Sequence, residues 1–507
     1  MTDLGAFAHG SDLVAGGDKV VVSIGDRIVV ADATGEIQGV ITGVSGASGL
    51  AMTADGTRVY AALQDTKEVA EIDTATREIT RRIDLAVYGC PFSLALTGER
   101  LWIGYGCDAT GVLGFDLSAP TSQPVVADTS LLKSSPYLAA AGDTLVVGEF
   151  TGSPTDLFVY DVSGAAPVLR GEIDGHAYSN QGLEDIAVTP DGSHIISAFR
   201  LPDAFTVWDA TTLAKVRAYE KGPEAEGWPR TVAVSPDGAF IAGARAWGVG
   251  MTVYDKASGT TLYATNPPQG EVVSGSAAYV GRDVYSLVKS DTDQLYLWRL
   301  HDVTLPASTL TLTAQPGGIA QQPLTLTGRL SFTEETAPGV QSLTVTRTAP
   351  DGTTATLPGA TTAADGTFTI TDTPSTGGPF AYTVLWNGNS EHRWSKASVT
   401  TAVRYKVGLT LTGPTSAVAG TTLVFRGTSQ ADGTTPPSRV PITIQRSLNA
   451  DGGDTVEWAV WISSNGTYRF ADMPEAGEYT YTVRWAGDDR TGPAEASQVV
   501  TVEKSND

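Results

Sequence analysis

Apolar residues in the first part of the chain recur in short alternating runs separated by polar turns. The segments 48–83, 184–219 and 230–265 follow the same order. Each has an apolar strand, a turn containing Asp-Gly, a second strand, a loop and a third strand that ends in aspartate. A Thr/Ser/Gly-rich turn and a fourth strand follow. This pattern predicts repeated four-stranded β units rather than amphipathic helices.

An aspartate near the end of each third strand marks the repeat. These aspartates lie 41 to 48 residues apart, at Asp32, Asp73, Asp116, Asp161, Asp209, Asp255 and Asp302. Seven units of this length predict a seven-bladed β-propeller over residues 1–303, with the last blade taking its outer strand from the N-terminus. An aspartate before Thr or Ser caps a turn by accepting backbone N–H bonds, so we expect these residues to be architectural.

A second repeat follows the first. DGTFTITDTP at 365–374 returns as NGTYRFADMP at 465–474, and AYTVLWNGNS at 381–390 returns as TYTVRWAGDD at 480–489. A period near one hundred residues with alternating strands predicts two β-sandwiches, at 304–405 and 406–507. The repeated Trp386 and Trp485 are expected in the sandwich cores or against the loops that follow them.

The chain's only two cysteines lie in one predicted hairpin, YGCPFSLALTGERLWIGYGC at 88–107. Pairing across its TGER turn places Phe92 opposite Tyr105. It also places Cys90 opposite Cys107, where directly opposed strand residues approach disulfide distance. We therefore expect a disulfide, which implies an oxidising compartment. The alternative is a pair of buried apolar thiols, while a zinc site would need more ligands.

Charge and hydropathy remove several classes of function. The formal net charge is −23 at pH 7, which disfavours binding to nucleic acid. No apolar stretch approaches the roughly 18 residues that a membrane span requires. The start, MTDLGAFAHG, lacks the basic and apolar segments of a signal peptide. With the expected disulfide, this favours a secreted chain whose leader has been removed over a cytosolic one.

Several short motifs resemble those of known repeat families. TPDG at 189–192, SPDG at 235–238, and the VYD or VWD that ends third strands resemble the YVTN and WD40-like seven-bladed propellers. A Gly-His pair occurs at 175–176 without recurring in each blade, which favours the YVTN-like variant. The second repeat resembles bacterial Ig-like domains that follow propellers in secreted actinobacterial proteins. The resemblance implies an all-β fold and an extracellular location, and it names no partner.

One face of the predicted propeller carries the richest side-chain chemistry. Loops between blades and loops between second and third strands share this face, where Cys90 and Cys107 also lie. Its candidate ligand-binding residues are His176, Tyr178, Asn180, Arg200, Trp228, Arg230, Arg245 and Trp247, with Glu149, Glu184, Asp185, Glu224, Glu226 and Lys289 on the same loops. Aromatic rings stack on sugar faces, and charged groups fix orientation. The structural alternatives are blade packing by Trp228 and an Arg245–Glu184 ion pair.

Catalytic and metal motifs are sparse. The five histidines show no metal-ligand spacing, and no G-x-S-x-G, G-x-G-x-x-G or P-loop motif occurs in the expected context. A funnel metal held by Glu149, Asn180 and Asp185 would make the chain a lactonase-like or lyase-like enzyme, which is the main alternative function. Calcium is the one cofactor left open, at the acidic loops 449–454 and 486–492, where solvated turns are the favoured interpretation.

These patterns predict a non-enzymatic recognition protein. The propeller is expected to bind a cell-surface glycan or protein, with the Ig-like domains as a spacer or as a stem that docks partner subunits of a larger secreted assembly. No nucleic-acid binding, membrane insertion, catalytic residue or bound metal is expected. A structural protein of the cell envelope is a further alternative.

Overall fold

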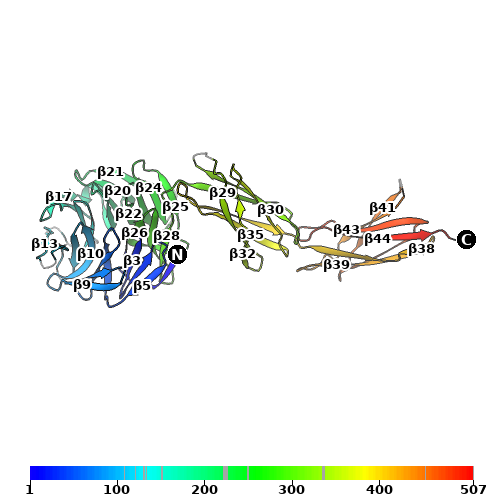
Figure 1. Cartoon of the computed structure of the whole chain (residues 1–507), viewed down its shortest axis with the longest axis horizontal. Coiled ribbons are helices and arrows are strands. Elements are labelled where there is room, and N and C mark those ends of the chain that lie inside the picture. The colour runs from blue at the N-terminus through cyan, green and yellow to red at the C-terminus, as the bar shows by residue number, and fades with distance from the viewer. Residues whose placement is uncertain are drawn as a thin grey trace. The chain divides into compact units, whose positions relative to one another are not determined.

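The protein is described from a computed structural model, for residues 1–107, 109–119, 122–129, 132, 134–149, 152–220, 227–247, 250–333, 337–450 and 453–505. These residues form β-strands and turns with one short helix, α1 (Gly175–Tyr178). The chain divides into two compact units, Met1–Leu305 and Pro306–Asp507, which Figure 1 shows in blue to green and in green to red. The all-β fold expected from the sequence is thus observed.

The described residues of the first unit form seven four-stranded sheets, numbered here as blades in chain order. Blades 1 to 4 comprise β2 (Leu13–Gly16), β3 (Lys19–Ile24), β4 (Arg27–Asp32) and β5 (Ile37–Ile41); β6 (Ala47–Met52), β7 (Arg58–Leu63), β8 (Glu68–Asp73) and β9 (Glu78–Asp84); β10 (Cys90–Thr97), β11 (Arg100–Gly106), β12 (Gly111–Asp116) and β13 (Val125–Val126); and β14 (Pro136–Ala141), β15 (Thr144–Glu149), β16 (Leu157–Asp161) and β17 (Val168–Ile173). Blades 5 to 7 comprise β18 (Gln181–Val188), β19 (His194–Leu201), β20 (Ala204–Asp209) and β21 (Lys215–Glu220); β22 (Pro229–Val234), β23 (Phe240–Arg245), β24 (Met251–Asp255) and β25 (Thr261–Thr265); and β26 (Glu271–Val280), β27 (Asp283–Lys289), β28 (Gln294–Leu300) and β1 (Thr2–Ala6).

The first strands of the blades close a ring. Each of β2, β6, β10, β14, β18, β22 and β26 neighbours the next, and β26 neighbours β2. The N-terminal strand β1 completes blade 7 by pairing antiparallel with β28, with Thr2 opposite Leu297, so the expected closure by the N-terminus is confirmed. Apolar cores fill the spaces between blades; Val21 of blade 1, for example, shares a buried cluster with Val59 of blade 2. This ring is the arrangement that defines a β-propeller.

Most of the repeated aspartates cap turns, as expected. Six end the third strands β4, β8, β12, β16, β20 and β24, and each accepts N–H bonds from the turn that follows. In blade 2, Asp73 accepts from the backbone of Ala75 and Thr76 at 2.9 and 2.8 Å, and these bonds lower its pKa. The seventh, Asp302, differs because it lies beyond β28 and contacts the ring of His301 at 3.0 Å.

The second unit contains two pairs of sheets. The first pair is β29 (Ser308–Ala314), β30 (Leu324–Phe332) and β34 (Thr367–Asp372), with β31 (Ser342–Thr348), β32 (Thr354–Thr356), β33 (Ala360–Thr361), β35 (Gly378–Trp386) and β36 (Ser395–Val403). The second pair is β37 (Val407–Thr412), β39 (Leu423–Ala431) and β42 (Thr467–Asp472), with β38 (Ser416–Val418), β40 (Pro441–Leu448), β41 (Thr455–Trp461), β43 (Gly477–Trp485) and β44 (Ala494–Glu503). In each pair, both sheets contribute to one apolar core, so each pair is a β-sandwich.

The two sandwiches repeat one buried polar cluster. Asp372 accepts from the Arg347 guanidinium at 3.0 Å and from the Tyr382 hydroxyl at 2.7 Å. Asp472 occupies the same place in the second sandwich and accepts from its own Arg–Tyr pair. Trp386 is buried in the first core, as its repetition predicted. The repeat therefore preserves both the apolar core and its polar anchor.

Candidate ligand-binding face

The expected site residues come from blades 5 and 6. His176 and Tyr178 lie in α1, which connects β17 to β18, and Arg200 lies near the end of β19. Trp228 directly precedes β22, and Trp247 follows β23. In antiparallel blades, the loop before the first strand and the loop between the second and third strands emerge at the same end. These side chains therefore belong to one face of the ring.

Two tryptophans from blade 6 form a corner on this face. The ring centroids of Trp228 and Trp247 are 4.9 Å apart and their planes meet at 75°. Trp247 is 55% exposed although its indole is large and apolar. Its φ of +53° is a left-handed conformation that non-glycine residues adopt at some cost. The fold thus exposes a tryptophan at a residue whose backbone conformation is energetically unfavourable.

The backbone around the corner is tightly constrained. The N–H of Ala246 donates to the carbonyl of Trp228 at 2.9 Å, which ties the two loops together. A Cβ at Gly227 would lie 1.2 Å from the carbonyl oxygen of Ala246, and the φ of Gly227 is +81°. Only glycine fits there. The backbone therefore fixes the positions from which the two indole side chains extend.

Arg200 covers Trp228 from blade 5. Its guanidinium carbon lies 5.4 Å from the centroid of the Trp228 ring, within cation–π range. Its Nε donates to one carboxylate oxygen of Glu184, and the Ser274 hydroxyl of blade 7 donates to the other. The Glu184 side chain is 5% exposed, whereas that of Arg200 is 57% exposed. A buried carboxylate thus orients a guanidinium whose other end faces solvent.

Arg230 approaches the same indole from β22. Its guanidinium carbon is 5.8 Å from the Trp228 centroid, and its Nη2 is 3.4 Å from a carboxylate oxygen of Glu271. Its Nε and the Nε1 of Trp228 are buried without a hydrogen-bond acceptor among the described residues. Hydrogen-bond donors therefore outnumber acceptors around the corner.

Arg245 occupies a different place from the one expected. Its side chain is 4% exposed and pairs with Asp203 of the β19–β20 loop, instead of Glu184 or solvent. It also reaches the carbonyls of Tyr219 and Gly227 at 3.3 and 3.4 Å. Arg245 thus joins blade 5 to blade 6 beneath the tryptophan corner, as a positioning residue rather than a surface ligand contact.

The residues from the β17–β18 loop are separated from the corner by their own packing. Asn180 is fully buried, which removes it from the surface where a ligand was expected to meet it. Tyr178 packs edge-on against Trp208 with centroids 4.7 Å apart, and His176 is exposed in α1. Glu224 and Glu226, which the sequence placed near the corner, lie outside the described residues.

The disulfide is present on the same face, in blade 3. The Cα atoms of Cys90 and Cys107 are 5.7 Å apart, so the predicted bond is confirmed. The expected strand register holds from Ser93 toward the turn, but an irregularity between Pro91 and Ser93 shifts the rest. Pro91, not Phe92, therefore pairs with Tyr105, and Cys90 lies beside Gly106. The bond tethers a blade other than those that carry the tryptophan corner.

Two carboxylates of the inner strands were not expected from the sequence to have a shared role. Asp12 accepts from the backbone N–H of Leu50 in blade 2 at 2.7 Å, and Asp185 accepts from that of Val232 in blade 6 at 2.8 Å. Burial raises the pKa of both to about 7, and the charge of Asp185 adds to the shift at Asp12. Matching positions in SDLVAG and EDIAVT were the available signal. Both groups hold neighbouring blades together.

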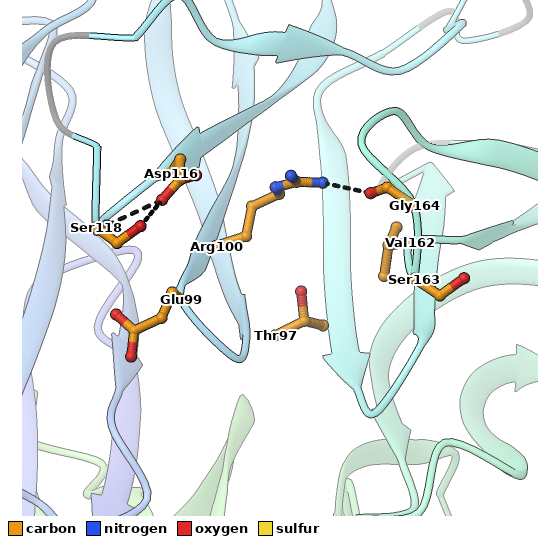
Figure 2. Close-up of a pocket in the computed structure, with 8 residues that line it drawn as sticks. All are labelled: Thr97, Glu99, Arg100, Asp116, Ser118, Val162, Ser163 and Gly164. Carbon is orange, nitrogen blue, oxygen red and sulfur yellow. Dashed lines mark hydrogen bonds between the residues drawn. The ribbon is translucent and has the colours of Figure 1, made fainter.

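A polar cavity of about 220 Å³ lies at the opposite end of blades 3 and 4. Figure 2 shows Arg100 reaching across it to donate to the Gly164 carbonyl at 3.1 Å, while Ser118 donates to Asp116. A cavity of about 240 Å³ lined by Asp32 recurs between blades 1 and 2. Turn-capping aspartates line both, so these hollows follow from the blade repeat.

Among the described residues, two acidic groups bring ligand atoms within 4.8 Å of one another: Asp156, Glu172 and Asp174, and Asp283, His301 and Asp302. Asp156 and Asp174 accept backbone N–H bonds around α1, and Asp283 pairs with Arg299 at 2.6 Å. In the loop 486–492, Asp488 caps a turn by accepting N–H bonds from Arg490 and Thr491. Residues 451–452 of the other acidic loop lie outside the described residues.

Comparisons with known proteins return structural similarities only. No protein-family profile and no curated protein match the chain. The Myceliophteria thermophila Cps50 (Swd1) β-propeller domain is 13% identical, with 59% of this chain and 99% of that chain covered and a TM-score of 0.45. Kuenenia stuttgartiensis hydrazine synthase is 14% identical (59% and 97% covered, TM-score 0.45), and Kluyveromyces lactis Hsv2 is 12% identical (57% and 98% covered, TM-score 0.40). These similarities do not extend to what the chain binds.

Membrane insertion through a helix has no support in the described part of the chain. None of the helices there has the length and apolar character that crossing a bilayer requires.

Proposed function

We propose that this chain is an extracellular recognition protein whose propeller binds a glycan through the face that carries Trp228 and Trp247. The carrying observation is the exposed Trp247 indole, held against Trp228 by a backbone in which only glycine fits at 227. A rigid exposed indole binds the apolar C–H face of a sugar without first having to be ordered. Scattered exposed apolar residues are normal, but a preorganised aromatic corner beside guanidinium groups is typical of recognition.

The proposal places the protein outside the cell, on a cell surface. A disulfide between Cys90 and Cys107 supports this location because such bonds persist in oxidising compartments. The two sandwiches would serve as a spacer, or as a stem that docks partner subunits. A protein ligand is the outcome that remains if the propeller face binds no sugar.

We propose a binding role rather than catalysis. Asp12 and Asp185 of the inner strands are the described carboxylates whose pKa is raised to about 7, a property that suits general acids and bases. Both already accept backbone N–H bonds from the next blade. Asp185 also accepts from the hydroxyl of Thr231, so its described contacts support a structural role between blades.

A glycan array probed with the full chain tests the proposal. We expect selective binding to a subset of glycans, and Trp247→Ala should weaken it on the order of tenfold or more by removing the stacking surface. Trp461→Ala is the matched control, since Trp461 is 65% exposed in the second sandwich. It should leave binding unchanged. Equal loss in both variants, or glycan binding that survives Trp247→Ala, would refute the site.

A further inference from the structure

Among the described residues around Trp228 and Trp247, hydrogen-bond donors outnumber acceptors. Beyond the bond from its Nε to Glu184, Arg200 has no hydrogen-bond acceptor for Nη1 and Nη2 among the described residues. The Nε of Arg230 and the Nε1 of Trp228 are also without acceptors there. Because those two atoms are buried, the donors that a ligand can reach are Nη1 and Nη2 of the exposed Arg200, and they favour a ligand that supplies acceptor oxygens.

The geometry of Arg200 selects among such ligands. Its Nε is fixed by Glu184, whose second oxygen is held by Ser274 of blade 7. The guanidinium is thereby oriented over Trp228, with its outer edge exposed. A guanidinium edge presents two parallel N–H donors that match the two oxygens of a carboxylate.

The ion pair between Arg200 and Glu184 leaves the outer edge of the Arg200 guanidinium available to a ligand. The one negative charge on Glu184 balances Arg200 electrostatically but satisfies only its Nε by hydrogen bonding. The net charge of −23 repels polyanions at long range. Counterions screen that repulsion beyond about 8 Å at physiological ionic strength. A contact at hydrogen-bond distance from Arg200 is therefore governed by the local guanidinium.

We propose that the glycan bound at this corner contains a hexuronate residue, with its carboxylate on Nη1 and Nη2 of Arg200 and its ring against the exposed face of Trp247. A hexuronate combines an apolar ring face with a carboxylate at the ring edge. The corner presents an indole surface and a carboxylate-matching donor pair, both adjacent to Trp228. This inference rests on the proposed glycan-binding function and names the class of sugar.

Matched acidic and neutral probes test the proposal by calorimetric titration of the full-length protein. The probes are galacturonate, glucuronate and mannuronate oligosaccharides, each beside its methyl ester, which keeps the ring and removes the charge. We expect at least one acid to bind roughly ten- to hundredfold more tightly than its ester. High salt should reduce this preference.

The variant Arg200→Gln tests whether the preference for the acid over its methyl ester arises at Arg200. Glutamine keeps an N–H donor for Glu184 but loses the charge and the paired outer donors. We expect this variant to bind acid and ester equally. Lys215→Gln is the control, because it removes the same charge from an exposed position at the far end of β21 in the same blade. It should keep the preference. Arg200→Gln should lower the unfolding midpoint, because the buried Glu184 carboxylate loses its ion pair, so each variant is titrated at a temperature well below its own midpoint.

Separate results overturn the two proposals. If a neutral glycan binds in a Trp247-dependent manner while no acid is preferred over its ester, the hexuronate inference is wrong and the glycan-binding function stands. A preference that persists in Arg200→Gln also overturns the inference. If neither the array nor the acidic oligosaccharides bind, both proposals fail.

Discussion

Replacing Arg245 with methionine removes a buried guanidinium and keeps most of the side chain's apolar stem. The carboxylate of Asp203, whose side chain is 24% exposed, loses its ion pair with Arg245. The carbonyls of Tyr219 and Gly227 lose a donor. The contacts that Arg245 makes between blade 5 and blade 6 beneath the tryptophan corner are thereby lost.

The expected cost follows from these contacts. Breaking a buried ion pair by removing one partner costs about 3–5 kcal/mol, because the other charge loses the compensation that this partner gave. Partial exposure of Asp203 places the value near the lower end, and the lost bonds to carbonyls add to it. We expect Arg245→Met to lower the free energy of unfolding of the propeller by about 3 kcal/mol. Asp203→Asn should lower it less, and the double variant should cost less than the sum of the two.

The measurement must report the propeller separately from the sandwiches. Hydrogen exchange followed by mass spectrometry across a urea titration of the full chain does so, with peptides from β19 to β24 as the readout. Arg217→Met is the control, because Arg217 makes a single exposed bond to the Ala257 carbonyl. It should shift stability by under about 0.5 kcal/mol. An unchanged midpoint in Arg245→Met together with lost ligand binding would show that Arg245 contacts the ligand directly.

Two further predictions concern the whole ring. Replacing Cys90 and Cys107 with serine should lower the free energy of unfolding by about 3 kcal/mol, because the bond closes a loop of 17 residues; unchanged stability in denaturant would contradict this. Burial raises the pKa of Asp12 and Asp185 to about 7, above the ordinary aspartate value of 3.8, so between those pH values the folded state keeps protons that the unfolded state has released. Their contribution to stability is full below about pH 4 and is lost as the pH rises through 7, by at most about 4 kcal/mol each, because the inner strands leave both side chains partly exposed. Asp12→Asn and Asp185→Asn should each flatten the fall in stability from pH 4 to 7, and a slope identical to that of wild type would show that neither carboxyl is protonated in the folded state.

Local patterns accounted for most of the strand arrangement. Alternation of apolar residues places side chains on two faces of a strand, and turn residues such as the Asp-Gly pairs end each strand through bonds to nearby backbone. Both effects act over a few residues, so they can be recognised from the sequence. The same holds for the six turn-capping aspartates, whose partners lie two to four residues away.

The predicted pairing of β10 with β11 was wrong where the regular strand pairing is interrupted. Counting back from the TGER turn gives the right pairs as far as Ser93, and the irregularity between Pro91 and Ser93 then moves Phe92 out of its expected place. Proline cannot donate a ladder bond, so it is a natural place for pairing to become irregular. The disulfide still forms because the bulged backbone keeps the two Cα atoms 5.7 Å apart.

The two arginines at strand ends show what the repeat alone could have revealed. In blade 6, Arg245 pairs with Pro229, and in blade 5, Phe199 pairs with Leu183. Aligning the two blades by these pairs matches Arg245 with the buried Phe199. Arg200 lies one residue further along. A shift of one residue turns a side chain to the other face of a strand. This signal was available, and it separates a buried arginine from an exposed one.

By itself, the sequence determined the four-stranded repeat, the sandwich repeat and the pairing of its two cysteines. These depend on periodicity and on groups that are near one another in the chain. Only the tertiary structure decided that Arg245 meets Asp203, that Glu184 meets Ser274 ninety residues away, and that Asn180 is buried. Such contacts join loops of different blades, and their geometry exists only once the ring has closed. The exposed Trp247 and the oriented Arg200 are therefore properties of the assembled face rather than of any one loop.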